Sequence, residues 1–198
     1  DKSNFIKCDY WIDDQSFFVE KGKRLFKLEH FPLKGMHNLQ NLLLVIAAAR
    51  KVGLSGKKIK DSLSNYRQLP HRMETIYKNK DLEIINDSKA TNFESSIAGI
   101  NSLEGQIIII SGGRLKGNKY NEWIKVLKKK VKCVFLFGES SKVLKMALIN
   151  EGFKKEIFEF SELKVLLNFV FPYLQNNRVG TLLFSPSCSS FDQFKNYE

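Results

Sequence analysis

From residue 73 onward, short apolar runs alternate with longer stretches that have one apolar face. The apolar runs predict buried strands over residues 73–77, 82–86, 106–111, 132–138, 156–160 and 179–185. Apolar residues at three- and four-residue spacing predict helices over 93–103, 119–130, 141–151 and 161–176, and a further helix from 190. This alternation predicts an α/β fold with a Rossmann-like, mostly parallel sheet, right-handed crossovers and flanking helices.

Before residue 67 the pattern is different. Brief apolar runs joined by polar turns predict antiparallel strands at 9–12, 16–19 and 24–28. A helix is predicted from His37, with leucines and an isoleucine on one face, until Gly53 ends it. Ser55 then caps a second helix that reaches about Tyr66.

The change of pattern around residues 67–70 predicts a domain boundary. We therefore expect one domain over residues 1–68 and another over residues 69–198. A chain of 198 residues is long enough to bury a core in each of two small domains. No internal repeat or low-complexity tract interrupts either part.

The amino-acid composition is typical of a folded protein from a reducing compartment. Hydrophobic residues make up 43% of the sequence and aromatic residues 12%, and no apolar run reaches the roughly 18 residues that span a bilayer. The first residues lack the basic and apolar regions of a secretory signal. The three cysteines are widely spaced and odd in number. We expect a cytoplasmic protein without a membrane partner.

The formal charge of +11 raises the question of nucleic-acid binding. However, the lysines are spread over many predicted elements, and the densest run, residues 125–132, has the pattern of a solvated helix face and last helical turn. A substrate and cofactor that both carry phosphates would account for part of the surplus through electrostatic steering, and a lysine-rich genome would account for the rest. We expect no nucleic-acid partner, although a basic α/β module that binds polyanions stays open as an alternative.

Polar loops follow three of the predicted strands: residues 86–92, 111–117 and 185–190. Ligands of open α/β sheets bind outside the carboxyl ends of the strands, so we expect the three loops to face one site. In the third loop the strand is predicted to break at Pro186 into small polar residues that open a helix. Such a junction presents hydroxyl and N–H groups to an anion.

Four motifs in matching order resemble the Mur ligases: His37-Asn38-Leu39-Gln40-Asn41, Leu69-Pro70-His71-Arg72, Asn86 to Asn92, and Ser185 to Tyr197. The third motif is similar to the branch of the family that adds D-glutamate. The resemblance implies that residues 1–68 are the strand-and-helix remainder of a P-loop-type central ATP-binding domain. It also implies that residues 69–198 are most of the family's C-terminal domain, where D-glutamate binds.

The resemblance further implies a bacterial enzyme of peptidoglycan precursor synthesis. Such an enzyme joins D-glutamate to UDP-N-acetylmuramoyl-L-alanine, using ATP and Mg²⁺, through an acyl phosphate. A P-loop and magnesium ligands are absent from this sequence, so the chain is interpreted as a fragment that is inactive by itself. We expect a monomer, and a sibling ligase that adds a different amino acid is the alternative within the family.

By resemblance, D-glutamate is bound by Thr91, Lys116, Ser190, Phe191 and Tyr197, with Lys89 near the reacting carboxylates. Contacts to ATP are implied for Asn38, Asn41, Arg72 and Asp87. No residue of the chain is assigned as catalytic or as a metal ligand.

Several of these residues also have simpler interpretations from the sequence. Asp87 and Lys89 can form an exposed ion pair. Gly112 and Gly113 can form an ordinary turn. His71-Arg72 can be a surface pair after a boundary proline, and Asn38 and Asn41 can satisfy the first turn of their own helix.

Two features of the sequence suggest a catalytic cysteine and a phosphate-binding loop, but neither matches the pattern that such a site requires. Cys188 has no histidine in a partner motif, so nucleophilic catalysis is not indicated. The stretch Gly53 to Lys58 has two residues between its glycines rather than four, and it follows a predicted helix instead of a strand. It is therefore predicted to be a turn between helices.

Overall fold

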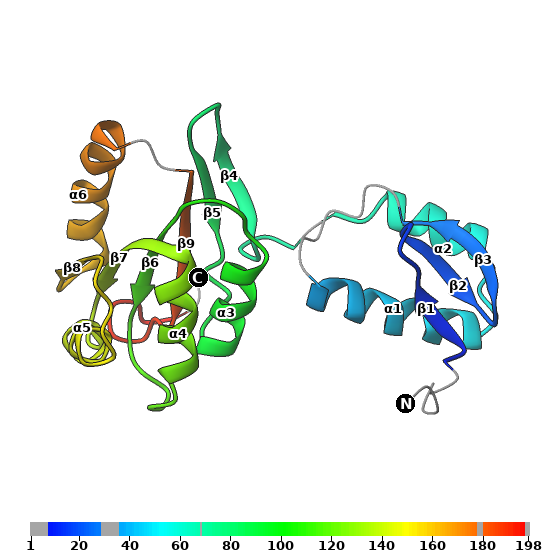
Figure 1. Cartoon of the computed structure of the whole chain (residues 1–198), viewed down its shortest axis with the longest axis horizontal. Helices are drawn as coiled ribbons and strands as arrows, with labels where there is room; N and C mark the ends of the chain where they lie inside the picture. Colours follow the sequence, from blue (N-terminus) through cyan, green and yellow to red (C-terminus); the bar gives the residue numbers. More distant parts are fainter. Residues whose placement is uncertain (1–7, 29–35, 68, 178–179, 197–198) are drawn as a thin grey trace. The chain divides into compact units, whose positions relative to one another are not determined.

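The computed structural model of the chain describes residues 8–28, 36–67, 69–177 and 180–196. It divides into two compact units, Asp1–Gln68 and Leu69–Glu198 (Figure 1). Within the described part of the chain, no helix combines the length and the apolar content that crossing a membrane requires.

The first unit packs two helices against a small antiparallel sheet. Its elements are β1 (Tyr10–Ile12), β2 (Phe17–Glu20), β3 (Lys23–Lys27), α1 (Met36–Lys51) and α2 (Gly56–Ser64), with the strands in sequence order. Ser55 caps α2 as predicted, because its side chain accepts the N–H of Lys58 at 3.3 Å. Between the helices, Gly53 has a φ of +89°, which confirms the predicted helix–helix turn. The core consists of Phe18, Phe26, Leu42, Ile46 and Ile59.

The second unit is built on a six-stranded sheet in the order β4-β5-β9-β6-β7-β8. Its strands are β4 (Glu74–Lys78), β5 (Glu83–Asn86), β6 (Ile107–Gly112), β7 (Val131–Phe137), β8 (Glu156–Phe160) and β9 (Thr181–Ser187). Strand β4 forms an antiparallel hairpin with β5, and the other neighbouring pairs are parallel. The predicted fold class, an α/β protein with a mostly parallel sheet, is confirmed.

Helices cover both faces of this sheet. They are α3 (Phe93–Asn101), α4 (Asn121–Lys130), α5 (Ser141–Asn150) and α6 (Leu163–Asn176). In β6, Ile107 and Ile109 face the cluster formed by α3, α4 and α5, whereas Ile108 and Ile110 face the cluster formed by α6. This explains why β6 is apolar without alternation, as is usual for a strand buried on both faces.

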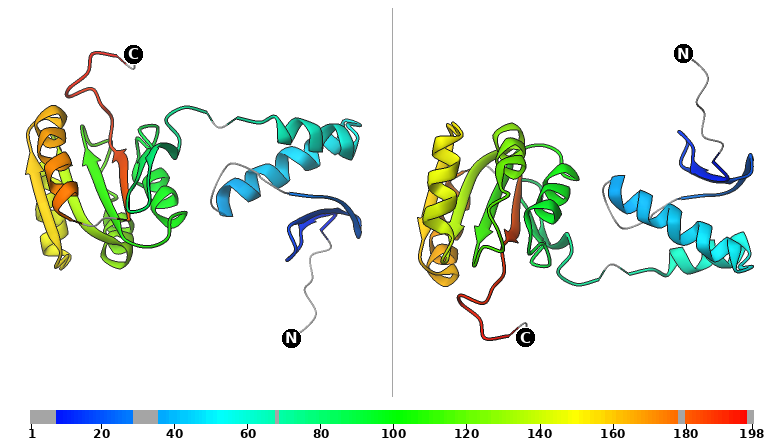
Figure 2. Two further views of the ribbon diagram at one scale, coloured as in Figure 1. Left: turned by 90° about the horizontal axis from the view of Figure 1, so that it is seen from above. Right: turned by 90° about the horizontal axis from the view of Figure 1, so that it is seen from below.

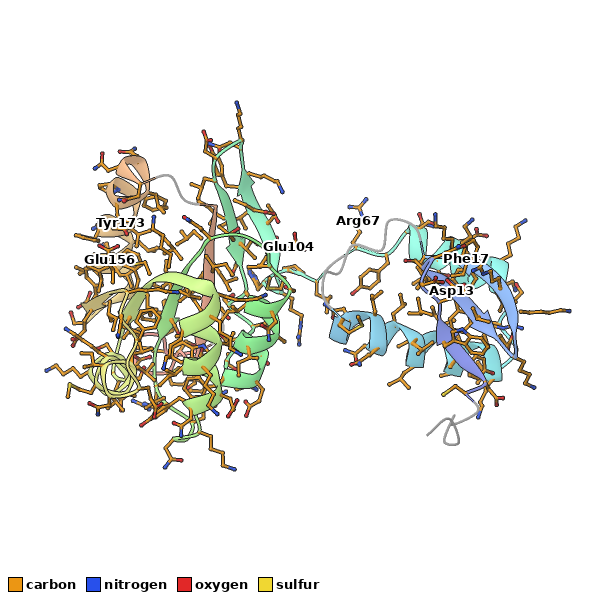
Figure 3. All side chains as sticks on the ribbon, viewed as in Figure 1. Asp13, Phe17, Arg67, Glu104, Glu156 and Tyr173 are labelled. Carbon is orange, nitrogen blue, oxygen red and sulfur yellow. The ribbon has the colours of Figure 1, made fainter. Side chains whose placement is uncertain are left out.

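Side-chain hydrogen bonds tie helices to neighbouring parts of the second unit. On the α6 side, the hydroxyl of Tyr173 donates to Glu156 Oε2 at 2.7 Å, linking α6 to the edge strand β8 (Figure 3). The lysine run 125–132 covers the second half of α4 and the start of β7. Lys130 Nζ donates to the carbonyls of Asn101 and Leu103, both at 3.1 Å, so part of the positive charge stabilises the end of α3.

The predicted break at Pro186 is wrong, because β9 continues through the proline to Ser187. A proline is tolerated there for two reasons. The pairing with β6 shifts by one residue between Ile110 and Gly112, and the pairing with β5 has already ended at Phe184. Proline is found in sheets at such bulges and unpaired edges.

The helix predicted from residue 190 is also wrong. Residues 191–193 form a single turn, and no helix follows within the described residues up to Asn196. Phe191 and Phe194 are 63% and 50% exposed, so the segment buries no apolar face that would stabilise a helix.

Candidate functional site

Three loops meet at the carboxyl edge of the second unit's sheet because β9 lies between β5 and β6. Figure 2 shows β9, in orange-red, inside the sheet rather than at its edge. The loop after β9 is bonded to both others. Ser187 N donates to Ala90 O at 2.8 Å, and Arg114 and Ser189 exchange backbone hydrogen bonds of 2.8 and 3.0 Å. The topology thus brings the three loops together, as predicted, whereas their binding of one ligand stays a prediction.

Two of the predicted D-glutamate residues are in direct contact. Lys116 Nζ, in the loop after β6, donates to Thr91 Oγ1, in the loop after β5, at 3.1 Å. Lys116 is exposed and Thr91 is half-buried, so the pair lies at the solvent-facing edge of the site. An ammonium group beside a hydroxyl is suited to bind a carboxylate.

The third loop contributes Ser190 and Phe191, which are both exposed. The carbonyl of Ser190 accepts the N–H groups of Gln193 and Phe194 at 3.1 and 3.0 Å and closes one turn. Tyr197, the remaining residue predicted for the D-glutamate site, lies outside the described residues.

Buried hydroxyl groups join the strands beneath the site. Ser111 Oγ donates to Pro186 O at 2.8 Å and lies 3.1 Å from Ser187 Oγ. Ser187 has a φ of +63°, a strained conformation for a residue other than glycine. The sequence placed both serines in polar loops whose hydroxyl groups would face an anion, whereas the structure places them at the strand ends with buried hydroxyl groups that bond to protein. They fix the ends of β6 and β9 relative to each other.

Asp87 lies at the base of the first loop and is buried. Its carboxylate accepts the N–H of Met73 at 3.2 Å and the hydroxyl of Ser185 at 3.0 Å. Burial raises the pKa of Asp87 to about 6, against the opposing effects of these two hydrogen bonds and of the Arg72 charge. The interpretation as an exposed ion pair with Lys89 is therefore wrong, since Asp87 is only 6% exposed.

Arg72 and Lys89 are exposed residues at the rim of the site. Arg72 stands between His71 and Met73, whose φ values of +65° and +48° form a tight turn at the start of the second unit. The backbone N–H of Lys89 donates to the carbonyl of His71 at 3.0 Å, which ties this turn to the first loop. The implied contacts of Arg72 and Asp87 with ATP stay predictions.

Asn38 and Asn41 belong to the first unit. They are three residues apart on α1, with Asn38 half-buried and Asn41 exposed. The implied role of these two residues in binding ATP also stays a prediction.

Gly112 and Gly113 allow a close approach of backbone segments. Their φ values are +146° and +121°, and a Cβ would meet the carbonyl oxygen of Phe137 at Gly112 and that of Ser189 at Gly113. The groups that require glycine here belong to neighbouring protein backbone. The two glycines thus allow close backbone packing, which fixes the start of the loop that carries Lys116.

Cys188 is buried beneath the third loop, with its Sγ 3.7 Å from Ser140 Oγ. Burial raises the pKa of its thiol to about 11, which keeps it protonated at neutral pH. Among the described residues, no three His, Cys, Asp or Glu side chains gather into a group that could hold a metal ion.

Known proteins match both a part of this chain and its whole length. A family model described as "Mur ligase, glutamate ligase domain" matches residues 71–188. The UDP-N-acetylmuramoylalanine--D-glutamate ligases of Prochlorococcus marinus strains MIT 9312 and MIT 9515 are 90% and 60% identical to this chain over its full length. The chain spans only 42% and 41% of the length of these two relatives.

Two solved structures share the fold at low sequence identity. The UDP-N-acetylmuramate–alanine ligase of Thermotoga maritima has a TM-score of 0.62 and 20% identity, covering 87% of this chain and 39% of its own. The folylpolyglutamate synthase of Mycobacterium tuberculosis, complexed with ADP and AMPPCP, has a TM-score of 0.64 and 14% identity, covering 79% of this chain and 39% of its own.

Proposed function

Because the chain belongs to the Mur ligase family, we propose that it forms the D-glutamate-binding part of a ligase. The complete enzyme would add D-glutamate to UDP-N-acetylmuramoyl-L-alanine at the expense of ATP. The observation that carries this proposal is the contact between Lys116 and Thr91 at the meeting point of the three loops. The name of the 90% identical relative supports the choice of amino acid.

D-Glutamate carries two carboxylates, and the site offers a binding group for each. Lys116 provides a positive charge, and Thr91 provides a hydroxyl beside it. Ser190 and the N–H of Phe191 provide hydrogen-bond donors on the third loop, and we assign Tyr197 to the same subsite. Each charge-assisted hydrogen bond contributes about 1.5–3 kcal/mol, so a few such bonds account for specific binding of a small dicarboxylate.

ATP would supply the phosphoryl group that activates the carboxylate of UDP-N-acetylmuramoyl-L-alanine. The amine of D-glutamate then displaces phosphate from that activated group. We assign contacts with ATP to Asn38, Asn41, Arg72 and Asp87, and we place Lys89 beside the reacting carboxylates. The complex of the mycobacterial synthase with ADP supports nucleotide use by this fold. We infer that the complete enzyme also uses Mg²⁺, as the resemblance to the family implies.

We also propose that the ligase works in the cytoplasm. The free thiols of Cys133 and Cys188 are buried within the second unit. Unpaired cysteines of this kind suit a reducing compartment.

The proposal is tested by changing Lys116→Ala in the complete ligase. The loss of one charge-assisted bond should raise the KM for D-glutamate at least about tenfold, because such bonds contribute roughly 1.5 kcal/mol or more. The KM for ATP should change little. Lys119→Ala is the matched control, since it removes an exposed lysine three residues further along the same loop.

Steady-state kinetics with each substrate varied in turn separate the outcomes. Unchanged kinetics for D-glutamate in a folded Lys116→Ala enzyme would refute the proposed subsite. Efficient ligation of a different amino acid, with D-glutamate rejected, would assign the chain to a sibling ligase instead.

A further inference from the structure

The tail turn, residues 190–194, is bound to a part of the sheet outside the three loops. Asp192 Oδ2 accepts the backbone N–H of Glu139 at 3.0 Å, directly after β7. Gly138 has a φ of +74°, and a Cβ at this position would meet the same carboxylate oxygen. The other oxygen, Oδ1, is shielded from solvent and has no hydrogen-bond partner among the described residues. The Asp192 carboxylate is therefore seated against the backbone of the turn after β7.

Gln193 binds the next turn, which follows β8. Its Oε1 accepts the N–H of Leu163 at 2.9 Å, and its Nε2 donates to the carbonyl of Ser161 at 3.1 Å. Leu163 is the first residue of α6, and the N-cap residue, Glu162, makes no capping bond with its own side chain. The Gln193 amide thus satisfies a helix N–H that the helix leaves unpaired.

These contacts fix the position of Ser190 and Phe191. The Ser190 carbonyl accepts the N–H groups of Gln193 and Phe194, so the backbone that carries Gln193 also holds Ser190. Both phenylalanines of the tail turn are at least half exposed, so burial of apolar surface contributes little to holding the turn. The hydrogen bonds of Asp192 and Gln193 therefore anchor the turn beyond Ser189, whose backbone is already bonded to Arg114.

We propose that Asp192 and Gln193 are positioning residues for D-glutamate, holding the Ser190 hydroxyl and the Phe191 N–H where they bind one of its carboxylates. This inference rests on the proposed function. Neither side chain is assigned a contact with substrate, and both act through the backbone of the tail turn. A turn that is ordered before the ligand arrives removes the entropic cost of ordering it during binding.

The test uses the complete ligase with Asp192→Ala and Gln193→Ala made separately. Each should raise the KM for D-glutamate about tenfold, which corresponds to a loss of about 1.4 kcal/mol in binding free energy. The KM values for ATP and UDP-N-acetylmuramoyl-L-alanine should stay the same. Amide hydrogen exchange should become faster in residues 189–194, and kcat should change less than KM.

Three further variants make the test specific. Asp192→Asn keeps an oxygen that can accept the Glu139 N–H and should restore most of the affinity for D-glutamate. Asp81→Ala and Gln175→Ala remove exposed side chains of the same types far from the tail turn in sequence, and both should behave like the unchanged enzyme.

The outcomes separate this inference from the function on which it rests. If Lys116→Ala weakens D-glutamate binding but neither Asp192→Ala nor Gln193→Ala does, the positioning role is overturned and the function stands. If none of the three has an effect, the proposed function itself fails. If both tail-turn variants reduce stability and affect all substrates equally, without rescue by Asp192→Asn, the two residues are only structural and the inference is overturned.

Discussion

Gly113 lies where the loop after β6 passes the chain leaving β9. Its φ of +121° and the nearness of the Ser189 carbonyl leave no room for a side chain. Arg114, the next residue, exchanges two backbone hydrogen bonds with Ser189. A methyl group at position 113 would therefore push apart the two loops that carry Lys116 and Ser190.

We predict that Gly113→Ala destabilises the second unit by about 2–4 kcal/mol, because a strained backbone and a steric clash add together. Unfolding in denaturant, followed by the fluorescence of buried Trp123 in a Trp11→Phe background, measures this unit alone. Gly117→Ala is the matched control. Gly117 has no positive φ, and a methyl group there would meet nothing within 4 Å, so this change should alter stability by less than about 0.5 kcal/mol. Equal effects at the two positions would contradict the steric argument.

We predict that Asp87 makes the stability of the second unit depend on pH. Its folded-state pKa of about 6 is above the ordinary value of 3.8, so between these values the folded protein binds more protons than the unfolded chain. Stability should therefore fall as the pH rises from about 4 to about 7, by up to about 3 kcal/mol from this group. In Asp87→Asn, which keeps an oxygen for the Met73 N–H, that part of the slope should disappear.

Denaturant unfolding of both proteins at several pH values measures this difference. Asp81→Asn, at an exposed carboxylate in the β4–β5 turn, should leave the slope as it is. A parallel pH dependence of the unchanged protein and Asp87→Asn would show that the burial of Asp87 does not raise its pKa.

At the scale of elements, the pattern of apolar runs predicted most strands and helices but not the order of the strands in the sheet. β9 is last in sequence and yet lies between β5 and β6. Nothing in its apolar run, Leu182 to Phe184, specifies this place, because β6 and β7 are also apolar strands buried on both faces. The position of β9 is what brings the third loop beside the other two.

The end of the chain shows where local signals fail. Pro186 and the serines after it are typical of a strand end and a helix start. In the structure, a shift in pairing accommodates the proline, and Asp192 and Gln193 bind distant turns instead of continuing a helix. Both outcomes depend on contacts with residues more than 25 positions away. Local propensity contains no information about such contacts.

The candidate site, like the fold, was predictable from the sequence only in part. Motif resemblance placed Lys116 and Thr91 in one site, and the structure brings them into contact. The buried partners of Asp87 were not predictable, because Ser185 is 98 residues away in sequence. The same is true of the anchoring of the tail turn, which requires the fold to be known first.

At the scale of the whole molecule, the chain forms two units with separate cores. The first is centred on Phe18 and Ile46, and the second has one apolar cluster on each face of its sheet. The boundary between them, at residues 68 and 69, falls between α2 and β4. The described residues on either side of it, from Asn65 to Arg67 and from Leu69 to Arg72, are exposed.

We therefore predict that limited proteolysis cuts first between about residues 65 and 71, since domain boundaries lie in exposed connections with few crossing contacts. Trypsin should cut after Arg67 and chymotrypsin after Tyr66, and each should leave a resistant product that contains the six-stranded sheet. Lys116 and Lys119 provide an internal comparison, because they are also exposed to trypsin but lie in a loop bonded to Thr91 and Ser189. Mass spectrometry of the first products identifies the bond. The contrary outcome is early cleavage after Lys116 or Lys119 while the segment around Arg67 is still intact. It would show that the loop after β6 opens more readily than the boundary, and that the two units do not behave as independent domains.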